Sequence, residues 1–167
     1  VLLGDSSDRV VSRHIGVPFW LMPRLDQVDL SWMVEELKKR QIKAIIPTRD
    51  SELLFWSSAK TRLEDEGIKV AVSDVQAVQL CLDKLSFSRI SSFKENLILS
   101  TIDLKDIPAG RKVVVKERFG SGSRDMILDV TKKEAREFAS NLQDPIFQPF
   151  ESGNEISIDA WFSSNRK

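Results

Sequence analysis

The sequence has little cysteine, no long apolar run and no excess charge of either sign. Its single cysteine, Cys81, cannot form a disulfide within the chain. This excludes a disulfide-stapled scaffold and fits a reducing compartment, so we expect a cytoplasmic protein. The longest apolar runs, PFWLMP and KAIIPT, fall well short of the ~20 residues that cross a membrane. No basic-then-apolar signal segment opens the sequence, and we expect no membrane partner.

Basic and acidic residues balance, with 25 Lys and Arg against 25 Asp and Glu. Proteins whose main partner is nucleic acid carry excess positive charge, so we expect no nucleic-acid partner. The hydrophobic share of 41% and the charged share of 30% are typical of a globular protein and exclude a disordered one. At 167 residues the chain can form one domain or two small ones. Any anion-binding site must therefore be a local cluster.

The first half alternates short apolar segments with amphipathic ones. The apolar segments, at residues 1–4, 18–22, 43–47 and 68–72, predict strands. Helical spacing of apolar residues from Leu30 to Leu37 predicts a helix with one buried stripe, and a second helix is expected from Asp50 to about Glu66. Strands separated by helices indicate βαβ units and a parallel sheet.

A third helix is expected after the fourth strand. Ser73 and Gln76 have the spacing of a capping box, which predicts that the helix begins there. The pair Asp83-Lys84 lies within this helical stretch or at a break in it. One helix and two helices both fit.

Beyond Pro108 the pattern changes to hairpins. Strands are expected at 113–117 and 124–130, the second with Met126, Leu128 and Val130 alternating. The capping box Thr131-x-x-Glu134 predicts a helix, and residues 145–151 and 155–162 predict two more strands. This order of strands and a helix indicates a second, antiparallel domain from about residue 110.

Two of the seven glycines fall in one short loop, Gly120-Ser121-Gly122-Ser123. The loop has two interpretations, a plain hairpin turn or a phosphate cradle in which Gly lets backbone N–H groups approach an anion. It is not a Walker A motif, a dinucleotide fingerprint or a protein-kinase loop, because Lys116 precedes the glycines and a strand follows them. The loop alone does not decide between the two.

A wider set of motifs resembles the ATP-grasp superfamily, in particular its carbamoyl-phosphate-synthase-like members. These motifs are Asp83-Lys84, then VVVKERFGSGSR at 113–124, then QPFESGNE at 148–155. The resemblance covers nearly the whole chain and implies a Rossmann-like pre-ATP-grasp domain at 1–80 that lacks its first strand. A helical linker at 81–109 and a C-terminally truncated ATP-grasp α+β domain at 110–167 would follow.

On this resemblance, Lys84 and Lys116 reach ATP phosphates, and the Gly/Ser loop closes over them. Gln148 and Phe150 read adenine through a main-chain carbonyl and N–H, while Glu155 binds ribose. The implied ATP-binding residues are Lys84, Lys116, Gly120, Ser121, Gly122, Ser123, Gln148, Phe150 and Glu155. No catalytic residue is assignable in this chain, and no metal ligand either, since the Mg²⁺ ligands are expected beyond residue 167.

The sequence departs from the family motifs at three positions. Glu117 stands where Pro is usual, Asp125 where Gly is usual, and Pro149 where Glu is usual. Glu117 and Asp125 add negative charge near the implied polyphosphate site and put its affinity for ATP in question. Pro149 is compatible, because the N–H it lacks is one that the expected adenine contacts do not use.

The implied function is an ATP-dependent carboxylate-amine ligase. Its partners would be ATP, a small carboxylate and an amine or ammonia, with a homodimer as one possible assembly. Two alternatives of the same fold stay open, a nucleotide-binding scaffold that has lost the chemistry and an ATP-grasp kinase. The sequence does not identify the acceptor.

Overall fold

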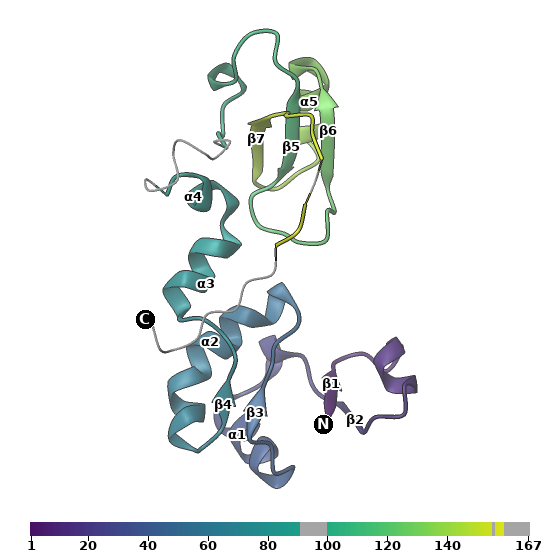
Figure 1. Ribbon diagram of the computed structural model, residues 1–167, viewed down its shortest axis with the longest axis vertical. Helices are drawn as coiled ribbons and strands as arrows, with labels where there is room; N and C mark the ends of the chain where they lie inside the picture. Colours follow the sequence, from purple (N-terminus) through teal and green to yellow (C-terminus); the bar gives the residue numbers. More distant parts are fainter. Residues whose placement is uncertain (91–99, 155, 159–167) are drawn as a thin grey trace. The chain divides into compact units, whose positions relative to one another are not determined.

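The computed structural model describes residues 1–90, 100–154 and 156–158. The chain divides into two compact units, Val1–Asp83 and Lys84–Lys167 (Figure 1). The predicted division into domains at 1–80, 81–109 and 110–167 stays a prediction. Each unit is described by itself below.

The first unit contains two short parallel sheets. Strand β1 (Leu3–Asp5) pairs with β2 (Phe19–Leu21), and β3 (Ala44–Ile45) pairs with β4 (Lys69–Val70). Its helices are α1 (Leu30–Lys39), α2 (Asp50–Asp65) and α3 (Val75–Leu82), with 3₁₀ turns at Val11–His14 and Leu25–Gln27. All four predicted strand segments and the parallel pairing are confirmed.

Helix α1 forms where the periodicity predicts it. The Asp29 side chain caps it by accepting hydrogen bonds from the backbone N–H groups of Ser31, at 2.8 Å, and Trp32, at 3.2 Å. Its apolar stripe packs into a core with buried residues of α2 and β4. The buried members of this core are Met33, Val34, Leu37, Trp56, Ala59, Leu63, Ile68 and Val70. Burial of this stripe is what stabilises the helix, since short isolated helices are marginal in water.

The predicted start of α3 was wrong by one residue. The N-cap is Asp74, not Ser73, and its carboxylate accepts from the backbone N–H of Ala77 at 2.9 Å. Asp and Ser are equally good caps, so the sequence did not separate them. The helix ends at Leu82, and α4 (Lys84–Ser88) begins as a separate helix.

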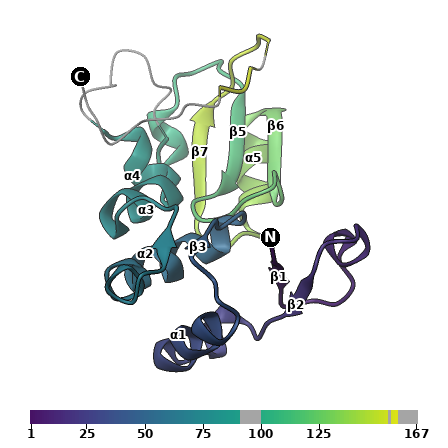
Figure 2. The ribbon, with the colours of Figure 1, turned by 60° about the horizontal axis from the view of Figure 1, so that its bottom comes forward.

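The second unit is built on a three-stranded antiparallel sheet. Strand β5 (Val113–Glu117) lies between β6 (Met126–Val130) and β7 (Pro145–Pro149). Helix α5 (Lys132–Ala139) covers one face, and Figure 2 shows the strands side by side with α5 behind them. A 3₁₀ turn at Leu104–Asp106 adds Leu104 to the core beneath α5. The predicted capping box at Thr131 and Glu134 is present in both directions.

Strand β6 does not alternate as predicted. Leu128 is 50% exposed, while Ile127 packs against the core and pairs with Val115. The register shifts by one residue between Ile127 and Val130, and Asp129 takes a φ of 53°. This is a β-bulge, which places one extra residue in a strand and changes the face of those beyond it.

The strand expected at 155–162 is not seen in the part of it that the structure describes. Residues 156–158 are in no strand, and Ile156 and Ile158, expected to face the core, are 76% and 81% exposed. Residues 155 and 159–162 lie outside the described ranges. Among the described residues, no helix is long and apolar enough to cross a membrane.

Candidate functional site

Lys84 lies against the base of the Gly/Ser loop. Its Nζ donates to the carbonyl of Gly120 at 2.6 Å and to that of Arg118 at 3.4 Å, and its own backbone N–H donates to the same Arg118 carbonyl at 3.3 Å. Lys84 is the first residue of α4, so these bonds join α4 to the loop. The sequence predicted the two features together, although they are 36 residues apart.

Lys116 lies on the face of β5 opposite α5. Val113 and Val115 are fully buried beneath the helix, so strand alternation turns Lys116 to the other face. There its Nζ donates to Oε1 of Gln148 on β7 at 2.8 Å. Burial, and in second place the nearby charge of Lys84, lower the pKa of Lys116. The charge of Lys84 thus disfavours the protonated form of Lys116, in the same direction as burial.

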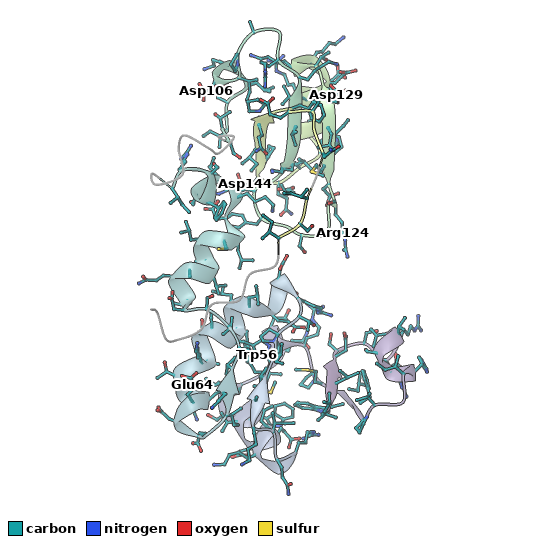
Figure 3. All side chains as sticks on the ribbon, in the orientation of Figure 1. Trp56, Glu64, Asp106, Arg124, Asp129 and Asp144 are labelled. Carbon is teal, nitrogen blue, oxygen red and sulfur yellow. The ribbon has the colours of Figure 1, made fainter. Side chains whose placement is uncertain are left out.

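The Gly/Ser loop has several residues in left-handed backbone conformations. Gly122 has a φ of 70°, Ser123 of 54° and Asp125 of 52°. Glycine adopts such angles without steric cost, and Asp tolerates them better than most residues. This explains how Asp125 occupies a position where the family motif has Gly. Figure 3 shows Arg124 and Asp144 at the loop end of the sheet and Asp129 at the other end.

Glu117 has a structural role in this fold. Its carboxylate accepts from the backbone N–H groups of Gln143, at 2.7 Å, and Asp144, at 3.0 Å, in the turn that leads into β7. As the next residue along β5, it points to the face opposite Lys116. Its negative charge is therefore directed into this turn. No local pattern predicted this bond, because Glu117 and Gln143 are 26 residues apart.

The main-chain groups of β7 differ from the expected adenine contacts. The N–H of Phe150 donates to the carbonyl of Lys112 at 2.8 Å, within the sheet. Hydrogen-bonded and open positions alternate along antiparallel strands. The main-chain groups of Gln148 therefore also point toward β5, whereas those of Phe147 and Pro149 point away from it. Phe147 confirms this alternation by exchanging both of its main-chain bonds with Thr101 on the outer side, each at 2.8 Å.

The remaining predicted residues fall into two groups. Ser121 and Ser123 are exposed in the loop, and Glu155 lies outside the described residues. No group of three or more metal-ligating side chains occurs among residues 1–90, 100–154 and 156–158. The described site thus consists of two lysines, a glycine loop and the edge of a sheet, which are groups that can hold a polyphosphate and a flat base.

Comparison with known proteins gives similarity in structure only. No protein-family model matches the sequence, and no curated protein matches it. A biotin carboxylase from Campylobacter jejuni, solved with β-γ-ATP, has a TM-score of 0.58 at 13% identity. The match covers 92% of this chain and 39% of that one.

Two further solved structures are also similar to this chain. The biotin carboxylase domain of a 2-oxoglutarate carboxylase from Hydrogenobacter thermophilus, solved as a dimer with MgADP, ADP and bicarbonate, has a TM-score of 0.53 at 16% identity over 81% of this chain and 35% of its own. A pyruvate carboxylase variant from Rhizobium etli, solved with acetyl coenzyme A, has a TM-score of 0.52 at 13% identity over 90% of this chain and 16% of its own.

The chain thus spans less than two fifths of the length of these proteins. At such low identity, the likeness shows the fold and not the activity. The closer likeness to carbamoyl phosphate synthases stays a prediction. The predicted fold class is confirmed: the chain has the mixed α/β fold, with parallel and antiparallel sheets, of ATP-grasp biotin carboxylase domains.

Proposed function

We propose that this chain is the nucleotide-binding part of an ATP-dependent ligase of the ATP-grasp type. One observation carries the proposal: Lys84 donates to the Gly120 carbonyl of the Gly/Ser loop, and its charge acts on the half-buried Lys116, which donates to Gln148. Burial makes the charged form of Lys116 costly, and the charge of Lys84 adds to that cost. A bound polyphosphate would offset that cost, because opposite charges attract strongly where solvent screening is reduced.

The two ends of the sheet suggest how a nucleotide lies. Lys116 and the loop would bind the phosphates at the loop end of the sheet. At the other end we assign the adenine contacts to the outward-facing carbonyl of Pro149 and the N–H of Glu151, one residue beyond the groups first expected. Gln148 then acts through its side chain, which positions the Lys116 ammonium group at 2.8 Å. Glu155 stays a candidate for the ribose contact.

The proposed reaction has two steps. A substrate carboxylate oxygen attacks the γ-phosphorus of ATP, the bond to the β–γ bridging oxygen breaks, and an acyl phosphate and ADP form. An amine nitrogen then attacks the acyl carbon, the bond to phosphate breaks, and an amide, phosphate and a proton are released. Lys84 and Lys116 would stabilise the charge on the transferred phosphoryl group, while the loop excludes water. Magnesium is expected with the nucleotide, but its ligands are not assigned to the described residues.

The acceptor and the assembly are further proposals. The Hydrogenobacter thermophilus domain was solved with bicarbonate and as a dimer. Bicarbonate therefore belongs among the carboxylates to be screened, and a homodimer is the first assembly to test by light scattering. The bonds of Glu117 to the turn before β7 direct its charge away from the face of Lys116, which supports nucleotide binding by the ligase and by the scaffold alike.

The proposal is tested by titrating the 167-residue chain with ATP and with GTP by calorimetry, with and without Mg²⁺. The Lys84→Met variant removes one ammonium group, and Lys133→Met, on the exposed side of α5, is the matched control. We expect ATP to bind more tightly than GTP, with about tenfold or greater loss in Lys84→Met and no change in Lys133→Met.

Equal affinities for the two nucleotides, or equal losses in the two variants, would contradict the proposed site. The ligase chemistry is tested by measuring ADP and free phosphate with each carboxylate and amine. Formation of ADP without free phosphate would favour the kinase alternative.

A further inference from the structure

Hydrogen bonds in both directions tie the turn before β7 to the end of β5. The Glu117 carboxylate accepts from the backbone N–H groups of Gln143, at 2.7 Å, and Asp144, at 3.0 Å. The N–H of Arg118 donates in return to the Asp144 carbonyl at 2.9 Å. The Arg118 guanidinium group also lies 3.6 Å from the Asp144 carboxylate (Asp144 is labelled in Figure 3). The last residue of β5 and the residue after it are thus both bonded to this turn.

Arg118 continues the connection to Lys84. Its carbonyl accepts from the backbone N–H of Lys84 at 3.3 Å and from Nζ at 3.4 Å. The same Nζ donates to the carbonyl of Gly120, two residues further along, at 2.6 Å. The N–H of Arg118 therefore holds the turn, while its carbonyl holds Lys84. The turn, Arg118 and Lys84 form one continuous chain of hydrogen bonds that starts at Glu117.

The bonds of Glu117 are suited to fixing a backbone in place. Hydrogen bonds to an ionised carboxylate are shorter and stronger than those between neutral groups. Oε1 accepts from Gln143 and Oε2 from Asp144, and the Glu117 side chain is partly buried. Proline, which is usual at this position in the family motif, has no side-chain acceptor for these bonds. This chain therefore anchors the residues before its Gly/Ser loop with bonds that the motif does not provide.

The charge of Glu117 could act on the phosphate site in two opposite ways. A carboxylate that faced the polyphosphate would repel it and weaken its binding. Strand alternation instead points Glu117 to the face opposite Lys116, where both of its oxygens accept from the turn. This geometry favours an action through the backbone, which strengthens binding.

We propose that Glu117 is a positioning residue for the phosphate site. It acts through the turn and the main-chain groups of Arg118, and it holds Lys84 where the phosphates of ATP bind. The role toward ATP rests on the proposed function. The coupling of Glu117 to Lys84 can be tested without a nucleotide.

The experiment compares Glu117→Gln with a matched control, Glu134→Gln. Glu134 also accepts from a backbone N–H, that of Thr131 at 2.7 Å, but it does so in the cap of α5. In either variant an amide NH₂ group replaces one carboxylate oxygen, and an NH₂ group cannot accept a hydrogen bond from a backbone N–H. Both variants therefore weaken a carboxylate–backbone contact in the second unit, whereas the bonds that lead to Lys84 start at Glu117.

The first readout is calorimetric titration with ATP. We expect Glu117→Gln to weaken ATP binding at least about threefold and Glu134→Gln to leave it unchanged. In a Lys84→Met background, the loss caused by Glu117→Gln should shrink to less than about twofold, because Lys84 can no longer transmit it. Tighter binding by Glu117→Gln would show that its charge repels the phosphates. That result, unchanged binding, or an undiminished loss in the Lys84→Met background would each overturn the proposal.

The second readout is amide hydrogen exchange of the ¹⁵N-labelled 167-residue chain without nucleotide. The Lys84 amide should exchange at least about threefold faster in Glu117→Gln than in the parent and in Glu134→Gln, because its acceptor on Arg118 is held less firmly. Equal exchange in the two variants would overturn the coupling. If the parent bound no ATP, the proposed function would be refuted, and the exchange rates would still decide whether Glu117 holds Lys84.

Discussion

Replacing Lys116 with Met should weaken ATP binding without destabilising the fold. Met is unbranched and apolar, so it fills the space of the lysine stem on β5 and removes the charge. The ammonium group that it removes is half-buried, is affected by the charge of Lys84 and donates to Gln148 at 2.8 Å. Each of the first two features disfavours the charged form in the folded chain, and both disappear in the variant.

The direction of the pKa shift gives the pH dependence. Because burial and Lys84 lower the pKa of Lys116 below 10.5, the folded chain holds this proton less tightly than the unfolded chain does. The resulting cost to stability is present at neutral pH and is relieved as the pH rises through the folded pKa toward 10.5. The free energy of unfolding of Lys116→Met should therefore equal or exceed that of the parent at pH 7. As the pH rises into the alkaline range, it should increase less than that of the parent.

The loss in affinity follows from the bond that Lys116 is proposed to make. A hydrogen bond to a charged group contributes about 1.5–3 kcal/mol, which corresponds to roughly 10- to 150-fold in the dissociation constant. Calorimetric titration with ATP and urea denaturation at two pH values, on the parent, Lys116→Met and Lys133→Met, measure both effects. Lower stability with unchanged ATP affinity in Lys116→Met would show that the lysine is structural and would refute the reasoning.

Three further predictions concern the fold of the second unit. Ile146→Ala removes a fully buried side chain and should cost about 2–5 kcal/mol by urea denaturation, so a cost near zero would contradict its place in the core. Gly122→Ala puts a side chain at a φ of 70° and should cost about 1–2 kcal/mol by the same method, although nothing clashes with it; no loss would mean that the loop adopts another conformation. Hydrogen bonds from Thr131 lower the pKa of Glu134, so Glu134→Gln should reduce stability above the unfolded pKa and have a shrinking effect as the pH falls; a pH-independent effect would rule out the charge as its cause.

Local chemistry in the sequence determined most of the secondary structure. The stripe from Leu30 to Leu37, the capping box at Thr131 and Glu134 and the glycines of the loop each act over a few residues. Each therefore predicted its element correctly. The order of apolar segments also predicted a parallel sheet followed by an antiparallel one. The start of α3 was missed because Ser73 and Asp74 are equally good caps, and only the path of the chain chose between them.

The site residues named from the sequence stay a prediction, and the bonds that they make could not be predicted. The resemblance put Lys84, Lys116 and the Gly/Ser loop in one site; the structure bonds Lys84 to the loop, and the charge of Lys84 acts on Lys116. The role of Glu117 in the turn before β7, and the inward direction of the Phe150 N–H, came only from the structure. Both depend on which residue lies opposite which across the sheet.

Strand register is the physical reason for this division. A shift of one residue turns every side chain and main-chain group of a strand to the other side. The bulge at Asp129 makes such a shift within β6, and the sequence around it alternates without interruption. The sequence thus determined which segments become strands and helices. Only the packed sheet decided which groups face the core, the neighbouring strand or a ligand.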